Sequence, residues 1–384
     1  MRRLIKLENN FDIKFDSSIK EFINPEFIYL PIDDGFDLLA FQNDKVLKGD
    51  TVLENRLKKV KSPVSGIIKG TTKLVFDGKE KKALVIQNSY EEKEKFYTKK
   101  RLSSFSKESI INMLYEYNLD EIANIFETKQ IKNLVISGME DEPYIENNSF
   151  ILKKYLKEIL EITDKLQNAF EFENTYVAVK STDTQNIDLY LNKIGMYPNI
   201  SLTLIEDKYL LATPFFLLEN MNLEEKDSLV LSSKDILNIY NILKNNIGVS
   251  ETFITISSPF IAKSKVIHVK IGSSLKEILN NNVVIKEKDV IYIYNGLMTG
   301  YEIEPKDVVI TNNTKGVIII PFLNEEEKPC NLCGMCYKIC PVKVNPKKVM
   351  DTKCKSKNCI DCGLCTYICP CKINLRKYLR GQNE

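Results

Sequence analysis

The hydrophobic pattern divides the chain into stretches of different character. In residues 1–90 the apolar runs are short and are separated by Gly, Pro and Asp; examples are FIYLPI, KVLKGDTVL, KSPVSGIIKG and ALVIQN. Short runs bounded by turn residues are typical of β-strands. Residues 89–107 mix charges and serine without an apolar period, which indicates a linker. The first 90 residues are therefore predicted to form an all-β domain.

From about residue 105, strand-like and helix-like periods alternate. KNLVISG at 132–138 has the continuous apolar character of a buried strand, and residues 148–172 have the apolar period of one long amphipathic helix. TYVAVKS, SLTLIE and SLVLSS continue as strands with helical segments between them, and a last helix ends at Asn246. This alternation predicts a mostly parallel sheet in a domain that spans residues 105–248.

The pattern changes again after residue 248. TFITIS, KVIHVKIG, VIYIYNG and GVIIIP have the character of strands, and SLKEILNN that of a single short helix. Strands around one short helix predict a β-grasp module over residues 249–323. The predicted fold class is therefore multidomain α/β: an N-terminal β barrel-sandwich of the biotinyl/lipoyl type, a central parallel-sheet domain, the β-grasp module, and a cysteine-rich helical domain over residues 325–384.

Composition excludes several classes of function. Lys and Arg total 54 against 52 Asp and Glu, so the net charge does not favour binding of nucleic acid. No apolar run approaches the roughly 18 residues needed to cross a bilayer, and no apolar stretch follows the first arginines as in a secretory signal. We therefore expect a cytoplasmic chain without a transmembrane segment of its own.

All ten cysteines lie between Cys330 and Cys371. A disulfide framework would not leave the first 329 residues without a cysteine, so this distribution indicates a reducing compartment and metal chemistry. His268 is the only histidine and lies in the strand-like KVIHVK. It is predicted to be exposed on an alternating strand, with a catalytic or metal-binding role as the alternative.

The cysteines form a repeat. CNLCGMCYKICP at 330–341 is followed, 29 residues later, by CIDCGLCTYICP at 359–370. The spacing C-x2-C-x2-C-x3-C-P is typical of two-cluster ferredoxins, in which the fourth cysteine of each motif ligates the cluster of the other motif. The predicted ligands are Cys330, Cys333, Cys336 and Cys369 for one [4Fe–4S] cluster, and Cys359, Cys362, Cys365 and Cys340 for the other.

Other assignments of the cysteines are weaker. Two zinc sites would use pairs of C-x2-C separated by long gaps, and they do not account for a duplicated triplet followed by Cys-Pro. Cys354 and Cys371 have no counterpart in the repeat and are interpreted as structural or incidental thiols, with a redox or alternative-ligand role as the alternative. Gly334 and Gly363 each follow the second cysteine of a motif, where a missing side chain lets backbone N–H groups approach the cluster sulfides.

Nearly the whole chain resembles the C subunit of the Rnf electron-transport complex. The resemblance rests on KVLKGDTVL, KSPVSGIIKG, VISGMEDEPYIEN, VIHVKIGSSLKEIL, YNGLMTGYEI, GVIIIP and the two cysteine motifs, in the same order, with CIDCGLCTYICPCKINLRKYLRG the most similar segment. It implies a ligand-binding type of β-grasp module. It also implies a central domain related to the NADH-oxidising subunit of respiratory complex I, with a glycine-rich loop for FMN and NADH.

The chain departs from this family where the glycine-rich loop is expected. No glycine occurs between Gly78 and Gly138, although such a loop needs glycine for backbone N–H groups to approach phosphate. We therefore expect neither FMN nor NADH to bind. Glu140, Asp141 and Glu142 are interpreted as a relic of the flavin site, with a helix-capping turn as the alternative.

These features predict an electron-transfer protein that passes electrons between a redox partner and a membrane-bound, ion-translocating complex. The expected partners are other Rnf-type subunits at the cytoplasmic face of the membrane, or a ferredoxin- or flavodoxin-like carrier. The alternatives are a soluble paralogue that feeds a dedicated reductase, and a non-catalytic ligand-binding or scaffold protein.

A cationic tail surrounds the cysteines. It either docks an acidic partner or offsets the negative charge of the clusters. Its members are Lys343, Lys347, Lys348, Lys353, Lys355, Lys357, Lys372, Arg376, Lys377 and Arg380.

Overall fold

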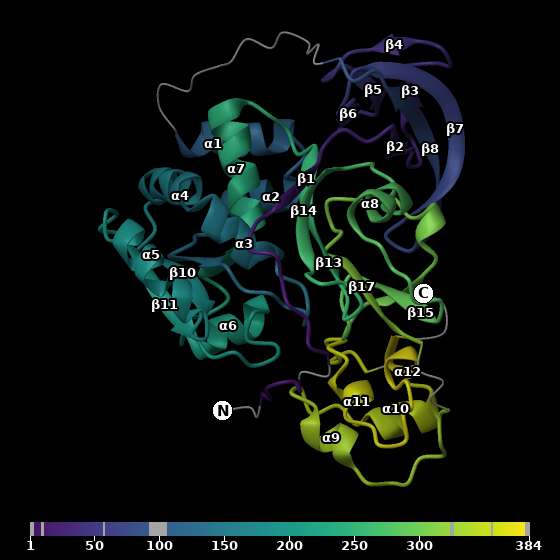
Figure 1. The fold of residues 1–384 in the computed structure, drawn as a ribbon. Helices are drawn as coiled ribbons and strands as arrows, with labels where there is room; N and C mark the ends of the chain where they lie inside the picture. The colour runs from purple at the N-terminus through teal and green to yellow at the C-terminus, as the bar shows by residue number, and fades with distance from the viewer. Residues whose placement is uncertain are drawn as a thin grey trace.

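The structure is a computed structural model, and it describes residues 4–8, 11–56, 58–91, 106–322, 326–354 and 356–380. In this part of the chain the strands form four sheets. Figure 1 shows β-strands in purple and blue at the upper right, a group of helices and strands at the left, a sheet in the centre, and the cysteine-containing helices below it. The predicted mixed α/β class with several sheets is confirmed. Most of the predicted linker lies outside the described residues.

The N-terminal strands form two antiparallel sheets, as their short apolar runs predict. The first sheet contains β2 (Phe27–Pro31), β8 (Lys79–Asn88), β7 (Gly66–Phe76) and β4 (Lys45–Val46), in that order. The second contains β3 (Asp37–Leu38), β5 (Thr51–Glu54) and β6 (Lys59–Lys61). Side chains from both sheets share one core, in which Ile28, Leu53 and Ile86 are fully buried.

The central sheet is parallel throughout, as predicted. Its order is β11 (Ile200–Ile205), β10 (Asn174–Lys180), β9 (Asn133–Ser137) and β12 (Ser228–Ser232). Every residue of β9 is buried, which agrees with its continuous apolar run. The helices of this region are α1 (Lys107–Glu116), α2 (Asp120–Thr128), α3 (Asn147–Lys154), α4 (Leu156–Phe170), α5 (Thr184–Ile194), α6 (Pro214–Asn220) and α7 (Ser233–Asn245).

The single long helix predicted over residues 148–172 is wrong. The structure divides it at Tyr155 into α3 and α4. Both helices pack against α7, but α3 also contacts the strand β13 (Glu251–Ser257), whereas α4 also contacts α5. The ring of Tyr155 packs edge-on against Phe253 of β13 at the break.

A mixed six-stranded sheet occupies the centre of the molecule. Its order is β1 (Lys20–Phe22), β14 (Lys265–Lys270), β13, β17 (Gly316–Pro321), β15 (Val290–Tyr294) and β16 (Tyr301–Ile303). Helix α8 (Leu275–Asn282) and the 3-10 turn η1 (Pro305–Asp307) belong to the same region. Strand β1 pairs with β14 in parallel, so residues 20–22 join this sheet and not the two N-terminal sheets.

The predicted exposure of His268 is wrong. Its side chain is only 16% exposed, because β14 is an internal strand between β1 and β13. The imidazole stacks on Phe253 with 4.5 Å between ring centroids, and its Nε2 lies 3.0 Å from a carboxylate oxygen of Glu251. Burial opposes ionisation of Glu251, but hydrogen bonds from His268 and Lys270 lower the pKa of this carboxyl to about 2.

The C-terminal region consists of short helices. They are α9 (Met335–Ile339), α10 (Pro346–Thr352), α11 (Leu364–Tyr367) and α12 (Arg376–Arg380), and they lie below the central sheet in Figure 1. They enclose a small core in which Val349, Leu375 and Leu379 contact Cys371 and Cys365. Among the described residues, no helix is both long and apolar enough to cross a membrane.

Candidate metal-cluster site

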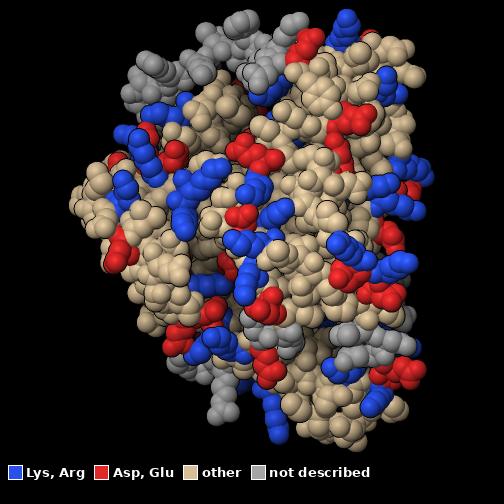
Figure 2. Space-filling view, viewed as in Figure 1, with Lys and Arg blue, Asp and Glu red and all other residues tan. Residues whose placement is uncertain are grey.

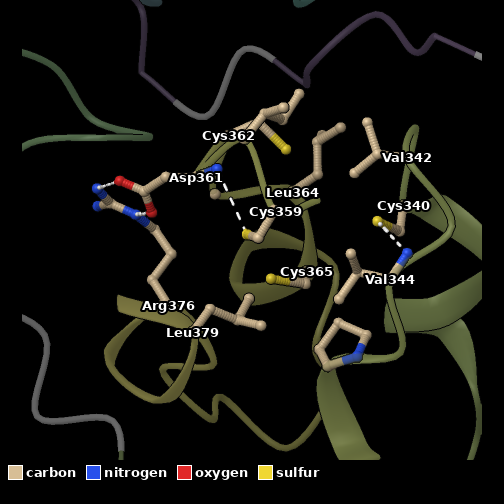
Figure 3. Close-up of a pocket in the computed structure, with 13 residues that line it drawn as sticks. Cys340, Val342, Val344, Cys359, Asp361, Cys362, Leu364, Cys365, Arg376 and Leu379 are labelled. Atoms are coloured by element: carbon tan, nitrogen blue, oxygen red, sulfur yellow. Dashed lines mark hydrogen bonds and ion pairs between the residues drawn. The ribbon is translucent and has the colours of Figure 1, made fainter. Parts of the chain in front are cut away.

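Four of the predicted ligands line one pocket. Cys340, from the end of the first motif, lies across the pocket from Cys359, Cys362 and Cys365 of the second motif (Figure 3). Apolar side chains surround the sulfur atoms and limit access of water; they are Val342, Val344, Pro346, Ile360, Leu364 and Leu379. The structure thus brings together thiols from both repeats, as the crossed spacing predicts.

Backbone N–H groups point to two of these sulfurs. The N–H of Val344 donates to Sγ of Cys340 at 3.2 Å, and that of Asp361 donates to Sγ of Cys359 at 3.4 Å. Such donors stabilise thiolate and tune the potential of a metal cluster bound to it. The donor set, the apolar walls and these N–H groups fit an iron–sulfur cluster.

Burial controls the protonation of the thiols. It raises the pKa of Cys362 to about 11 and that of Cys365 to about 12, and the neighbouring thiols act in the same direction. At neutral pH these groups therefore hold their protons until a metal replaces them, since metal-binding cysteine is thiolate.

The first triplet is more exposed. Cys333 is exposed, and Cys330 and Cys336 are half-buried. Burial, and then the proximity of Cys330 and Cys333, raises the pKa of Cys336. The N–H of Lys328 donates to the carbonyl of Cys371 at 3.0 Å. This bond brings the segment that precedes the first motif beside the segment that follows Cys369.

The cysteines are not grouped around a single ion. Within the described ranges, no three Cys, His, Asp or Glu side chains lie close enough together to hold one metal ion. A cubane does not require that closeness, because each of its four thiolates binds a different iron atom.

Arg376 fixes the second cysteine loop. Its guanidinium donates to both carboxylate oxygens of Asp361, at 2.7 and 2.8 Å (Figure 3). It also donates to the carbonyl of Thr299 at 2.6 Å and to that of Gly300 at 3.2 Å. The side chain is only 12% exposed. Of the two interpretations of the cationic tail, a docking surface does not apply to Arg376, because this cation is used inside the molecule.

Glu142 contacts the loop formed by residues 296–300, which contains the two carbonyls that accept from Arg376. Its carboxylate accepts hydrogen bonds from the N–H of Met298 at 2.9 Å and from the hydroxyl of Thr299. Burial raises the pKa of Glu142 to about 7, although these two hydrogen bonds oppose the shift. The loop therefore lies between a buried carboxyl from the parallel-sheet region and Arg376 of the cysteine region.

The other two acidic residues make separate contacts. A carboxylate oxygen of Glu140 accepts from the N–H of Ser149 in the first turn of α3, at 3.1 Å. Burial raises the pKa of Glu140 to about 8. Asp141 forms an ion pair with Lys315 at 2.5 Å. Glu140 thus accepts from a backbone N–H near the start of α3. Both interpretations of the trio, a flavin-site relic and a helix-capping turn, stay predictions.

The remaining members of the cationic tail are partly neutralised. Lys347 pairs with Asp351, and Lys377 pairs with Glu327. In Figure 2 the lower end of the molecule is mostly uncharged on the face shown, with a few residues of each sign. Lys355 lies outside the described residues.

Sequence reasoning missed the groups that connect the second cysteine motif to the parallel-sheet region and to the loop 296–300. The hydroxyl of Tyr209 donates to the carbonyl of Cys362 at 2.8 Å, and these two residues are 153 positions apart in the chain. The contacts of Thr299 with Arg376 and of Glu142 with residues 296–300 were likewise not identified. No periodic or spacing signal marks such contacts, because they form only when distant segments dock.

These features define a class: a mixed α/β protein of several sheets whose cysteine-rich end has the spacing and the donor set of an iron–sulfur module. No family model matches the chain. The chain is 23% identical over 344 residues to the C subunit of the ion-translocating oxidoreductase complex of Haemophilus influenzae (strain PittEE). It is 22% identical over 354 residues to the protein of the same name from Buchnera aphidicola.

These matches cover 82% and 85% of the chain and confirm its resemblance to this family of C subunits. The C subunit of the proton-translocating ferredoxin:NAD(+) oxidoreductase complex of Clostridium ljungdahlii is 22% identical over 230 residues, which is 57% of this chain and 50% of that protein. The chain spans about half the length of the Haemophilus relative (52%) and 75% of that from Buchnera.

Among solved structures, an NAD+-reducing [NiFe]-hydrogenase in the air-oxidised state matches 72% of this chain and 60% of its own, at 9% identity. The TM-score is 0.49, and a likeness of this degree carries no information on function.

Proposed function

We propose that the chain is an electron-transfer subunit that holds two [4Fe–4S] clusters in its C-terminal region. Cys330, Cys333, Cys336 and Cys369 would ligate one cluster, and Cys359, Cys362, Cys365 and Cys340 the other. The observation that carries this proposal is the pocket in which Cys340 joins the second triplet. When bound, such clusters supply one-electron redox chemistry at low potential.

The residues of the chain have distinct tasks in this proposal. The thiolates bind iron, and the N–H groups of Val344 and Asp361 stabilise the sulfur charge. Val342, Leu364 and Leu379 exclude water. The proposed domains are a barrel-sandwich over 1–90, a complex-I-like α/β domain over 105–248, a β-grasp module over 249–323 and a ferredoxin-type domain over 325–384.

The central domain has no FMN or NADH site of its own in this proposal. The segment where the family has a glycine-rich loop lacks glycine, and the nearby carboxyls are committed to internal contacts. Glu140 accepts from the N–H of Ser149 in α3, Asp141 pairs with Lys315, and Glu142 accepts from the N–H of Met298. Electrons would therefore reach the cysteine region from another protein.

The exposure of the two triplets suggests where that protein binds. Cys333 is exposed, whereas Cys365 is buried in the core of the cysteine region. Large apolar side chains near Cys333 are also exposed, namely Leu332, Met335 and Tyr337. We propose that an electron carrier, or another subunit of an Rnf-type complex at the cytoplasmic face of the membrane, contacts this end.

Anaerobic reconstitution tests the proposal. Iron and sulfide analysis, flavin analysis and low-temperature EPR of the dithionite-reduced protein should give about eight irons per chain, signals of two interacting [4Fe–4S]+ clusters and no flavin. NADH should fail to bleach the cluster absorbance. Zinc in place of iron would refute the cluster assignment. Stoichiometric FMN with rapid bleaching by NADH would refute only the missing flavin site.

A further inference from the structure

A second cavity lies between three parts of the chain, away from the cysteines. Its walls are residues 59–63 of the N-terminal sheets, the turn 116–119 between α1 and α2, and the segment 245–250 that follows α7, with Ile271 and Asn312 beside them. Its volume is about 460 Å³, within the range typical of small-molecule sites.

This cavity is separate from the region of Glu140 and Glu142. Helix α7 begins directly after β12, at the carboxyl edge of the parallel sheet, and its end at residue 245 leads into the cavity wall. A helix that follows a parallel strand runs back along the sheet, so the cavity lies toward the amino edge. Nucleotides in open α/β sheets bind at the carboxyl edge. The acidic residues, which follow β9, lie at that carboxyl edge.

The lining of the cavity favours a negatively charged ligand. Lys48, Lys59 and Lys61 line it from the N-terminal sheets, and Glu116 is the one acidic side chain among the described lining residues. The ammonium of Lys61 lies 5.0 Å from the ring centroid of Tyr117 on the facing wall. A cationic and an aromatic surface therefore meet in the same space.

The rest of the lining favours an apolar body. Apolar side chains come from every wall; they are Leu30, Val60, Pro63, Leu119, Val249 and Ile271. Burial of an apolar ligand surface against these side chains would be favourable.

We propose that this cavity binds a small organic anion. The ligand would place its carboxylate, phosphate or sulfonate group at Lys59 and Lys61, and its aromatic or aliphatic body against Leu119 and Ile271. The site is independent of the clusters, so its test does not depend on the proposed function.

The test uses 8-anilinonaphthalene-1-sulfonate, which carries a sulfonate, an aromatic body and one N–H. Isothermal titration calorimetry of the complete reconstituted chain should show one saturable site whose affinity falls as salt is added. Lys59→Gln and Lys61→Gln should each weaken binding by about tenfold, which is the loss expected for one favourable charge contact in a cavity. Lys73→Gln is the matched control, because Lys73 is exposed on β7 and pairs with Glu80 away from the cavity.

The outcomes separate clearly. Loss of affinity in the two cavity variants, with none in Lys73→Gln, supports the proposal. Absence of saturable binding to the wild-type chain overturns it, as does equal affinity in Lys59→Gln and Lys73→Gln. Lys59 is exposed, so Lys59→Gln keeps the test decisive even if Lys61→Gln disturbs the contact with Tyr117.

Discussion

At the scale of single residues, Cys340 distinguishes crossed from local ligation. It belongs to the first motif in the sequence, yet its sulfur lines the pocket of the second triplet. If each motif instead held its own cluster, Cys340 would have to turn toward Cys330 and Cys336, away from the N–H of Val344 that now donates to it.

Substitution of Cys340 by serine tests this placement. We expect Cys340→Ser to lower iron content from about eight to about four per chain, and to leave an EPR spectrum that matches that of Cys362→Ser. Cys354→Ser is the control, because Cys354 is exposed and lies outside both motifs; it should keep all its iron. A spectrum of Cys340→Ser that instead matched that of Cys336→Ser would show local ligation.

Glu142 gives the molecule a pH dependence. Burial raises the pKa of its carboxyl from 4.5 to about 7. Between these values the folded chain keeps the proton and the unfolded chain loses it. The free energy of unfolding therefore falls as pH rises, by up to about 1.4 kcal/mol per pH unit for one group.

The variant Glu142→Gln should remove this contribution. The neutral amide keeps one acceptor for Met298 or Thr299 but cannot ionise. We expect the thermal midpoint of the wild-type chain to decrease as pH rises from about 5 to about 7. The decrease should be less steep in Glu142→Gln, because unfolding of the variant releases about one proton fewer. Anaerobic thermal unfolding at closely spaced pH values measures both slopes, and equal slopes would contradict the expectation.

At the scale of elements, the loop 296–300 connects the central sheet to the second cysteine motif. It follows β15, accepts hydrogen bonds from Arg376 through two carbonyls, and donates to Glu142. A Cβ on Gly363 would lie only 2.3 Å from the carbonyl oxygen of Met298 in this loop. The position therefore requires glycine for close packing as well as for its backbone conformation.

Gly334 is the matched control for Gly363, because each precedes the helix of its motif. Their φ angles are 72° and 76°, so alanine meets similar backbone strain at either position, but no atom lies within 4 Å of a Cβ at Gly334. Gly363→Ala should therefore destabilise the chain by about 1–3 kcal/mol more than Gly334→Ala. Thermal unfolding and the EPR of each cluster check this, and equal losses would show that the loop contact is unimportant.

At the scale of the whole molecule, one side of the cysteine region packs against the sheet-containing part of the chain, and its other side is exposed. Tyr209, Arg376 and Gly363 bind the second motif to the central part of the chain. The first motif carries the exposed Leu332 and Tyr337. This polarity suggests that one cluster site faces a partner and that the other is held by the scaffold.

Charge near the first motif tests whether an acidic partner docks at this end of the molecule, just before the cationic tail begins. Lys338 on α9 is exposed. If an acidic carrier docks there, Lys338→Glu should slow reduction by a ferredoxin or flavodoxin several-fold at low salt, and the difference should vanish at high salt because screening removes steering. Stopped-flow mixing measures the rate, with Lys73→Glu as control. If the lysines only offset cluster charge, the substitution would change the rate equally at both salt concentrations.

Much of the architecture was predictable from the sequence. The short apolar runs of residues 1–90, the buried strand β9 and the alternation that produces a parallel sheet are local patterns, and local burial preferences determine them. The grouping of Cys340 with the second triplet in one pocket was predictable from the cysteine spacing, whereas the ligand sets of the two clusters stay a prediction. The break of a helix at Tyr155 and the burial of His268 were not predictable, since each depends on a neighbour distant in sequence, Phe253.

The sequence alone therefore determined the element types, the parallel central sheet and the cysteines to be considered as ligands, because each follows from chemistry repeated over a few positions. Only the tertiary structure decided that Arg376 is an internal clamp, that Glu142 holds the loop beside the second motif, and that three segments enclose a cationic cavity. These features depend on the docking of separate sheets, and the free energy of such contacts is set by geometry that no short stretch of sequence contains.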